Sequence, residues 1–221
     1  SLWLPAFCAE KYPDTYTVFA GGDDFFLIGP WLQTQKLAAE MREQFRRYVA
    51  ENAAITFSAG IAVIKPGLPP GKLSAYAEEA LEAAKAYPAN ENEKRKQLGS
   101  KNSVCVYGQV VSWQQWSGIQ EAFERIGRLK EAYGLSTGFV YSMLQFCEQA
   151  EAEKGGDINA GMWRSRFAYR TRRFVNDSKS ITDKNNGYAR LTEAFYQNGI
   201  GKLGAKYRIP LFNHFYLLRA K

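Results

Sequence analysis

The feature that most constrains the fold is a run of apolar residues interrupted by two glycines and two aspartates. Residues 16–20 and 25–28 are rich in β-forming side chains, and Gly21, Gly22, Asp23 and Asp24 separate them. This pattern is typical of a β-hairpin with carboxylates at its turn, because glycine tolerates the positive φ that tight turns require. We therefore expect the chain to be organised around this hairpin.

Asp23 and Asp24 are the candidate chemical groups of the hairpin. Two neighbouring carboxylates repel each other, so burying them is costly unless a cation lies beside them. Carboxylate oxygens suit Mg²⁺ or Mn²⁺, and Mg²⁺ readily shares its coordination shell with substrate phosphates. The pattern predicts a metal–nucleotide site, at which Gly21 and Gly22 let a bulky ligand approach the backbone. An ordinary acidic turn is the alternative, but the apolar flanks are unusual for a surface excursion.

The chain then continues with helix, strand, helix and strand. Apolar residues recur at helical spacing over residues 31–50 and 72–87 and alternate over 55–64, before a charged loop at 88–100 and a strand at 104–107. This order predicts a ferredoxin-like palm over residues 1–109, an α+β domain with one antiparallel sheet and helices on one face. Such a unit normally begins with another strand and helix, so we expect a fragment, or a subunit that another chain completes.

The strand expected at residues 55–64 has two different faces. One face fits burial under helices and carries Ile55, Phe57, Ala59, Ile61 and Val63. The other face is small and hydroxylated, with Thr56, Ser58, Gly60 and Ala62. The second face suits a sheet surface left open for a ligand, although a partly solvated strand has the same pattern.

From about residue 110 the pattern changes to successive amphipathic helices, so residues 110–221 are expected to form an all-α domain. One of these helices is strongly basic and interleaves aromatic residues with Arg164, Arg166, Arg170, Arg172 and Arg173. With a formal net charge of +7 and a pI near 9.2, this favours contact with RNA or another polyanion. A neighbouring protein subunit or a solvated helix face are the alternatives.

The three cysteines lie far apart and form no CxxC motif, so neither a disulfide framework nor a zinc site is expected. No apolar run reaches the length of a membrane span. A reducing, cytoplasmic setting without membrane contact is therefore the expectation.

The stretch YTVFAGGDDFFLIGPW at residues 16–31 closely resembles the second palm domain of the large, polymerase-like subunit of type III-A CRISPR effector complexes. Further matches are the sequences FSAGI at 57–61, ALEAAK at 80–85 and KNS at 101–103. The order of palm and helical domain is also similar. The ordered set is more specific than the Gly-Gly-Asp-Asp motif alone.

The resemblance implies that the intact subunit uses Mg²⁺ to convert ATP into cyclic oligoadenylates when the complex, with its crRNA, binds target RNA. It implies that Asp23 and Asp24 are catalytic metal ligands and that Gly21 and Gly22 accommodate the nucleotide. Ser58 would line the nucleotide pocket, while Lys85 and Lys101 would face phosphates. Because the pocket of this family forms between two palms, a first palm domain and other effector subunits are the implied partners.

The sequence departs from the family in lacking the HD-type nuclease domain and the zinc-binding cysteines. Its only histidine, His214, lies in an apolar segment and is expected to be packed, so no His-Asp pair supports DNA cleavage. A diguanylate cyclase-type enzyme is a second hypothesis, but that family has GGDEF or GGEEF where this chain has GGDDFF. The third is a non-catalytic scaffold that binds RNA or other subunits.

Overall fold

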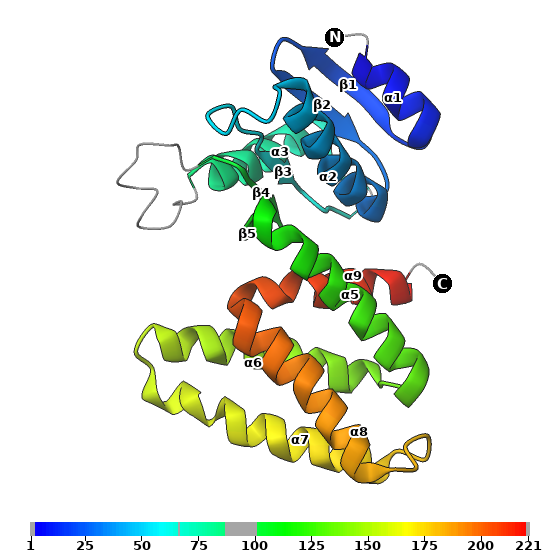
Figure 1. Ribbon diagram of the computed structural model, residues 1–221, viewed down its shortest axis with the longest axis vertical. Coiled ribbons are helices and arrows are strands. Elements are labelled where there is room, and N and C mark those ends of the chain that lie inside the picture. The colour runs from blue at the N-terminus through cyan, green and yellow to red at the C-terminus, as the bar shows by residue number, and fades with distance from the viewer. Residues whose placement is uncertain (1–2, 66, 87–100, 220–221) are drawn as a thin grey trace. The chain divides into compact units, whose positions relative to one another are not determined.

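The computed structural model describes residues 3–65, 67–86 and 101–219 (Figure 1). The chain forms two compact units, Ser1–Trp113 and Gln114–Lys221. The first unit contains helices and small sheets, and the second contains helices alone among its described residues. The expected α+β palm-like fold followed by a helical domain is therefore confirmed. The charged loop expected at 88–100 lies outside the described residues.

The hairpin forms as expected. Strands β1 (Tyr16–Gly21) and β2 (Asp24–Ile28) pair antiparallel, and Gly21 lies opposite Asp24. This register leaves Gly22 and Asp23 as a two-residue turn. The register shifts between Thr17 and Phe19, which places a bulge at Val18.

Two helices cover one face of the hairpin, as Figure 1 shows. Helix α1 (Trp3–Lys11) was not predicted, whereas α2 (Trp31–Tyr48) follows Pro30 as the periodicity predicts. The buried side chains of this layer are Leu4, Phe7, Cys8, Tyr12, Leu37 and Met41, against which Ala20, Phe25, Leu27 and Phe57 pack. The hairpin therefore has one buried and one outer face.

A second, separate sheet follows. It contains β3 (Ala59–Ile61), β4 (Ser103–Val106) and β5 (Gln109–Ser112), in the order β3-β4-β5. Strands β3 and β4 run parallel, and β4 and β5 run antiparallel. The expectation of one antiparallel sheet was therefore wrong in detail, because the described strands form a hairpin and a mixed sheet. The strand expected at 55–64 has only three paired residues, and β5 was not predicted.

Helix α3 (Pro70–Lys85) packs directly on β3, and Gly60 is the point of closest approach. A Cβ on Gly60 would lie 2.2 Å from the backbone nitrogen of Leu81. The face of the strand that was expected to be open to a ligand is therefore covered at Gly60. Gly60 serves the close packing of a helix backbone against a strand instead.

The second unit is a helical bundle. Its elements are α5 (Trp113–Tyr133, of which Trp113 belongs to the first unit), α6 (Thr137–Lys154), η1 (Ile158–Met162), α7 (Trp163–Asp177), α8 (Lys184–Leu191), η2 (Thr192–Gly201), η3 (Gly204–Tyr207) and α9 (Arg208–Arg219). The hydroxyl of Ser136 accepts a hydrogen bond from the amide of Phe139 and caps α6, as the sequence predicts. η2 is a π-helix, which the sequence does not predict.

Apolar side chains from most of these helices form one core, which includes Phe139, Met143, Phe167, Phe195 and Tyr207. His214 is 3% exposed, which confirms that it is a packed residue. Burial and the nearby charge of Lys130 lower its pKa. Among the described residues, no helix combines the length and the apolar character that crossing a bilayer requires.

We predict that Gly60→Ala destabilises the first unit by about 2–4 kcal/mol, because a methyl group would collide with the backbone of α3. Urea unfolding of the chain, followed by far-UV circular dichroism, measures the change. Gly71→Ala is the matched control, since Gly71 lies in α3, the helix that packs on Gly60, and its new Cβ would have no atom within 4 Å. Equal stability of the two variants would contradict the close packing.

Candidate nucleotide and metal site

The turn of the hairpin presents both candidate carboxylates to solvent. Gly22 has a φ of +62°, and a positive φ at only the first central residue is the sign pattern of a type II′ turn. Asp23 is the second turn residue and Asp24 opens β2, and both are exposed. No atom lies within 4 Å of the place where a Cβ of Gly22 would be. The space above the turn is therefore open to a bulky ligand.

Asp24 lies on the outer face of the hairpin. Phe25 and Leu27 pack on the helices, so the alternation of a strand places Asp24, Phe26 and Ile28 on the other side. Gly21 pairs with Asp24 and therefore lies on the same outer face. The ring of Phe19 covers Gly21, since a Cβ on Gly21 would lie 3.0 Å from that ring. The outer face has exposed apolar side chains, namely Tyr16, Val18, Phe19 and Ile28. The apolar flanks that argued against a surface excursion are therefore exposed on this face.

Ser58 and the segment around Lys101 lie together. The hydroxyl of Ser58 accepts a hydrogen bond from the amide of Asn102 over 3.1 Å, which joins the residue before β3 to the residue before β4. Asn102 has a φ of +84°, a conformation that asparagine tolerates better than most residues. Lys101 is exposed and precedes this contact. The structure therefore brings together two of the predicted nucleotide-binding residues.

Lys85 ends α3 close to the same region. Its ammonium pairs with Glu82 over 3.1 Å. The hydroxyl of Ser103 donates to the carbonyl oxygen of Ala84, which ties the start of β4 to the residue before Lys85. Ser58, Lys85 and Lys101 are thus grouped around the beginning of β4.

A stacked aromatic pair joins this group to the hairpin. The rings of Phe25 and Phe57 stack with centroids 5.9 Å apart and an interplanar angle of 11°. Phe25 follows Asp24, and Phe57 precedes Ser58. Phe57 also contacts the rings of Phe45 and Trp113, each with centroids 5.9 Å apart. The aromatic cluster therefore fixes the spacing between the carboxylate turn and the Ser58 group.

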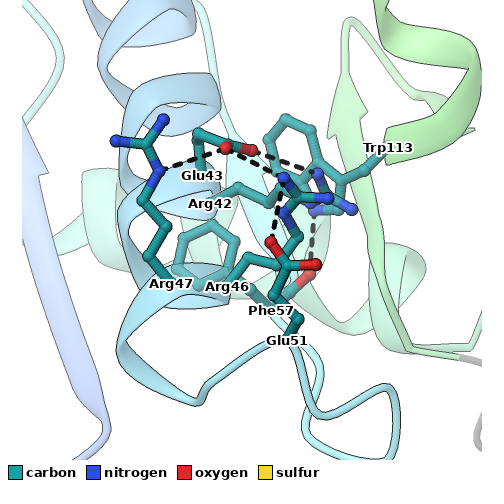
Figure 2. Close-up of polar contacts among 7 residues, drawn as sticks. All are labelled: Arg42, Glu43, Arg46, Arg47, Glu51, Phe57 and Trp113. Atoms are coloured by element: carbon teal, nitrogen blue, oxygen red, sulfur yellow. Dashed lines mark hydrogen bonds and ion pairs between the residues drawn. The ribbon is translucent and has the colours of Figure 1, made fainter.

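The segment that enters this cluster is held by ion pairs (Figure 2). Glu43 of α2 lies among Arg42, Arg46 and Arg47, and Arg46 also pairs with Glu51 over 3.5 Å. Partial desolvation acts to raise the pKa of Glu43, but the hydrogen bond from Arg46 and the three positive charges keep it below its usual range. Figure 2 also shows the indole nitrogen of Trp113 donating to the carbonyl oxygen of Phe57, over 2.8 Å.

The donor set fits a hard divalent cation in a limited way. Asp23 and Asp24 supply carboxylate oxygens on an open turn, which suits Mg²⁺ or Mn²⁺. In the described part of the chain, no group of three or more metal-ligating side chains forms. A cation here would therefore need water and ligand phosphates to complete its shell, as Mg²⁺ commonly does.

The arginines of α7 have different surroundings. All five are exposed. Arg164 pairs with Glu153, Arg172 stacks over Tyr188, and Arg173 pairs with Asp177. Arg170 donates weakly to the carbonyl of Gly138, over 3.4 Å, and Arg166 has no hydrogen bond or ion pair within the described residues. The helix therefore presents a basic face, part of which is used in internal contacts.

The sequence placed Phe57 only on a strand face that fits burial and gave Asn102 no individual role, so the contacts of both residues in this region were missed. Their structural partners, Phe25 and Ser58, are distant in sequence. The only local signal was the ability of asparagine to adopt a positive φ. Neither contact could be derived from periodicity.

The two units and the hairpin site define the class of protein: a palm-like α+β domain followed by a helical domain. Residues 4–104 match the family model described as Cas10/Cmr2, second palm domain. Over these residues the chain is therefore similar to the second palm domain of Cas10/Cmr2 proteins.

Three relatives illustrate the match. The chain is 36% identical over 104 residues to the CRISPR system single-strand-specific deoxyribonuclease Cas10/Csm1 (subtype III-A) of Methanocaldococcus jannaschii, covering 47% of this chain and 13% of that protein. It is 36% identical over 144 residues to the protein of the same name from Thermococcus onnurineus, covering 62% and 18%. The corresponding protein of Enterococcus italicus is 30% identical over 134 residues, covering 58% and 16%. The chain thus matches less than a fifth of the length of these relatives.

We predict that Phe57→Ala destabilises the first unit by about 2–3 kcal/mol and loosens the hairpin, because three ring contacts are lost. Hydrogen exchange of the β1 and β2 amides, with urea unfolding, measures both effects. Phe19→Ala is the control, since Phe19 belongs to the same hairpin but is 54% exposed. If both variants lost the same stability, the Phe57 cluster would not be the link between the hairpin and Ser58.

Proposed function

We propose that this palm is a Mg²⁺-dependent nucleotidyltransferase that converts ATP into cyclic oligoadenylates within a type III-A CRISPR effector. The main support is the combination of a Cas10-type second palm with two adjacent carboxylates at an open hairpin turn. The reaction joins the 3′-hydroxyl of one ATP to the α-phosphate of another and releases pyrophosphate.

Asp23 and Asp24 are proposed to hold the metal, through carboxylate oxygens that remain accessible at the turn. A bound Mg²⁺ or Mn²⁺ would lower the pKa of the attacking hydroxyl and neutralise the negative charge of the leaving pyrophosphate. Gly22 leaves room for the triphosphate, because it has neither a side chain nor a close neighbour at that position. Gly21, on the outer face, would let the nucleotide approach the strand closely.

Ser58, Lys85 and Lys101 are proposed to bind the nucleotide. The lysines would contribute positive charge beside phosphates, as phosphoryl transfer generally requires. Lys85 would have to exchange its contact with Glu82, an exposed pair that contributes little stability. Ser58 already accepts one hydrogen bond and keeps its own hydroxyl hydrogen for a ligand.

The proposed reaction requires partners, since the chain matches less than a fifth of its relatives' length. A first palm domain would complete the nucleotide pocket, and the effector with crRNA and target RNA would provide activation. The exposed arginines of α7 are proposed to contact RNA or a neighbouring subunit. The DNA cleavage named for the relatives is not proposed for this chain, whose one histidine is buried.

A non-catalytic scaffold is the second candidate function. The observation that favours it is the exposure of Asp23 and Asp24, with no third metal-ligating side chain grouped with them among the described residues. A diguanylate cyclase-type activity differs in substrate, so an assay with ATP and with GTP distinguishes it.

We predict that Asp23→Asn combined with Asp24→Asn lowers ATP conversion by at least about 100-fold, because the carboxylate charges that hold the metal are lost. The measurement uses labelled ATP and Mg²⁺ with the target-bound effector that contains a first palm domain. RNA binding by the same assembly should remain unchanged.

Asp14→Asn is the matched control, since Asp14 is an exposed aspartate of the same unit and its carboxylate accepts one hydrogen bond from the described residues, from Gln33 over 3.2 Å. It should retain conversion within about twofold. Unchanged conversion by the double variant would favour the scaffold, and consumption of GTP in place of ATP would favour the diguanylate cyclase-type activity.

A further inference from the structure

A hollow of about 350 Å³ lies in the helical unit, and none of its lining residues belongs to the proposed palm site. Its lining comes from three elements, with Arg125 and Leu129 on α5, Arg190 on α8, and Glu193, Ala194 and Asn198 on η2. Its volume is at the lower end of the range of small-molecule pockets. Two guanidinium groups, one carboxylate and one amide are its polar groups.

Arg125 is the unusual member of this set. Among the described arginines of the helical unit, only Arg125 and Arg208 are half-buried. Arg208 has a carboxylate partner, Glu148, at 3.4 Å, and stacks over Phe212. Arg125 has no hydrogen bond or ion pair with any described residue. A partly desolvated charge without a partner is costly, so an anion in the hollow would relieve that cost.

The π-helix η2 forms the wall opposite α5 and supplies the carboxylate and the amide of the hollow. Hydrogen bonds in a π-helix join residues five apart, so Glu193 and Asn198 lie one turn above one another. The ring of Tyr207 packs against this helix at Gly199, where a Cβ would lie 2.7 Å from that ring. π-helical segments occur frequently at functional sites.

These groups match one ligand chemistry. Arg125 and Arg190 can each donate paired hydrogen bonds to the oxygens of a phosphate. A carboxylate such as Glu193 accepts hydrogen bonds from ribose hydroxyls, and an amide such as Asn198 can both donate and accept. A ribose phosphate presents an anion and vicinal hydroxyls at a separation that a hollow of this size can hold.

We propose that the hollow between α5, α8 and η2 binds a ribose phosphate, either as a free nucleotide or as part of an RNA chain. Arg125 and Arg190 bind the phosphate, and Glu193 binds the 2′-hydroxyl. This site is independent of the palm reaction, and its occupancy does not require Asp23 or Asp24.

Titration of the isotope-labelled 221-residue chain with adenosine 5′-monophosphate, followed by NMR, tests the proposal. We expect chemical-shift changes at α5, α8 and η2, with a Kd of about 1 mM or tighter. The 2′-deoxy nucleotide should bind at least about threefold more weakly, because it lacks the hydroxyl that Glu193 accepts. Glu193→Gln should remove this preference and keep phosphate binding.

Arg125→Gln should weaken binding by about tenfold, and Arg125→Lys should have an intermediate effect because it keeps the charge without the paired donors. Arg128→Gln is the matched control, since Arg128 lies on the same helix but is exposed and paired with Glu124. Thermal unfolding of each variant verifies that the helical unit remains folded. Equal binding by wild type and Arg125→Gln, or equal binding of the two nucleotides, overturns the proposal.

A 5′-phosphorylated RNA tetramer identifies the source of the ligand. If the tetramer binds at least about tenfold more tightly than the mononucleotide, the site is assigned to RNA. The tighter binding must be retained in Arg170→Gln, because its loss in that variant would place the RNA on the basic face of α7. Equal binding of tetramer and mononucleotide assigns it to a free nucleotide. Absence of shift changes at the hollow with every probe, up to about 10 mM, overturns the proposal.

Discussion

The packing of Phe57 is the interaction on which the geometry of the palm unit depends. The hairpin and the mixed sheet are not hydrogen-bonded to each other through the described strands. Phe57 connects them by stacking on Phe25, while its carbonyl oxygen accepts a hydrogen bond from Trp113. Because Phe25 and Phe57 are adjacent in sequence to Asp24 and Ser58, this ring contact links the strand that begins at Asp24 to the segment that carries Ser58.

The chain reaches Phe57 through a turn that local preferences alone would not form. Ala50 and Glu51 have positive φ values of 52° and 60°, which non-glycine residues rarely adopt. The amide of Glu51 donates to the carbonyl of Arg46, and its carboxylate pairs with the side chain of the same arginine. Arg46 and Glu43 thereby hold the turn, so the charged end of α2 has a structural role in placing Ser58.

The elements that the sequence predicted are those that local chemistry specifies. The hairpin follows from alternating apolar residues around glycines, and the start of α6 follows from the capping hydroxyl of Ser136. Strand β5 was missed because Gln109–Ser112 is short and runs directly into α5. The π-helix was not predicted, and Gly199 within it packs against the ring of Tyr207. At the candidate site, the two turn carboxylates could be predicted because they are neighbours in one short motif. The contact between Ser58 and Asn102 could not, because the two residues are 44 positions apart.

The exposure of the carboxylate turn has a chemical consequence. Two carboxylates in full contact with water compete poorly for Mg²⁺, which loses its own waters reluctantly. A triphosphate bound as proposed would add oxygen ligands at the same place, so metal and nucleotide would bind together and each would strengthen the binding of the other. The outer face beside the turn is apolar at Tyr16, Phe19 and Ile28 and would need to be covered before water could be excluded from the reaction. Under the proposed function, activity would therefore depend on what assembles over the hairpin, and Asp23 and Asp24 would supply the charge around which that assembly forms.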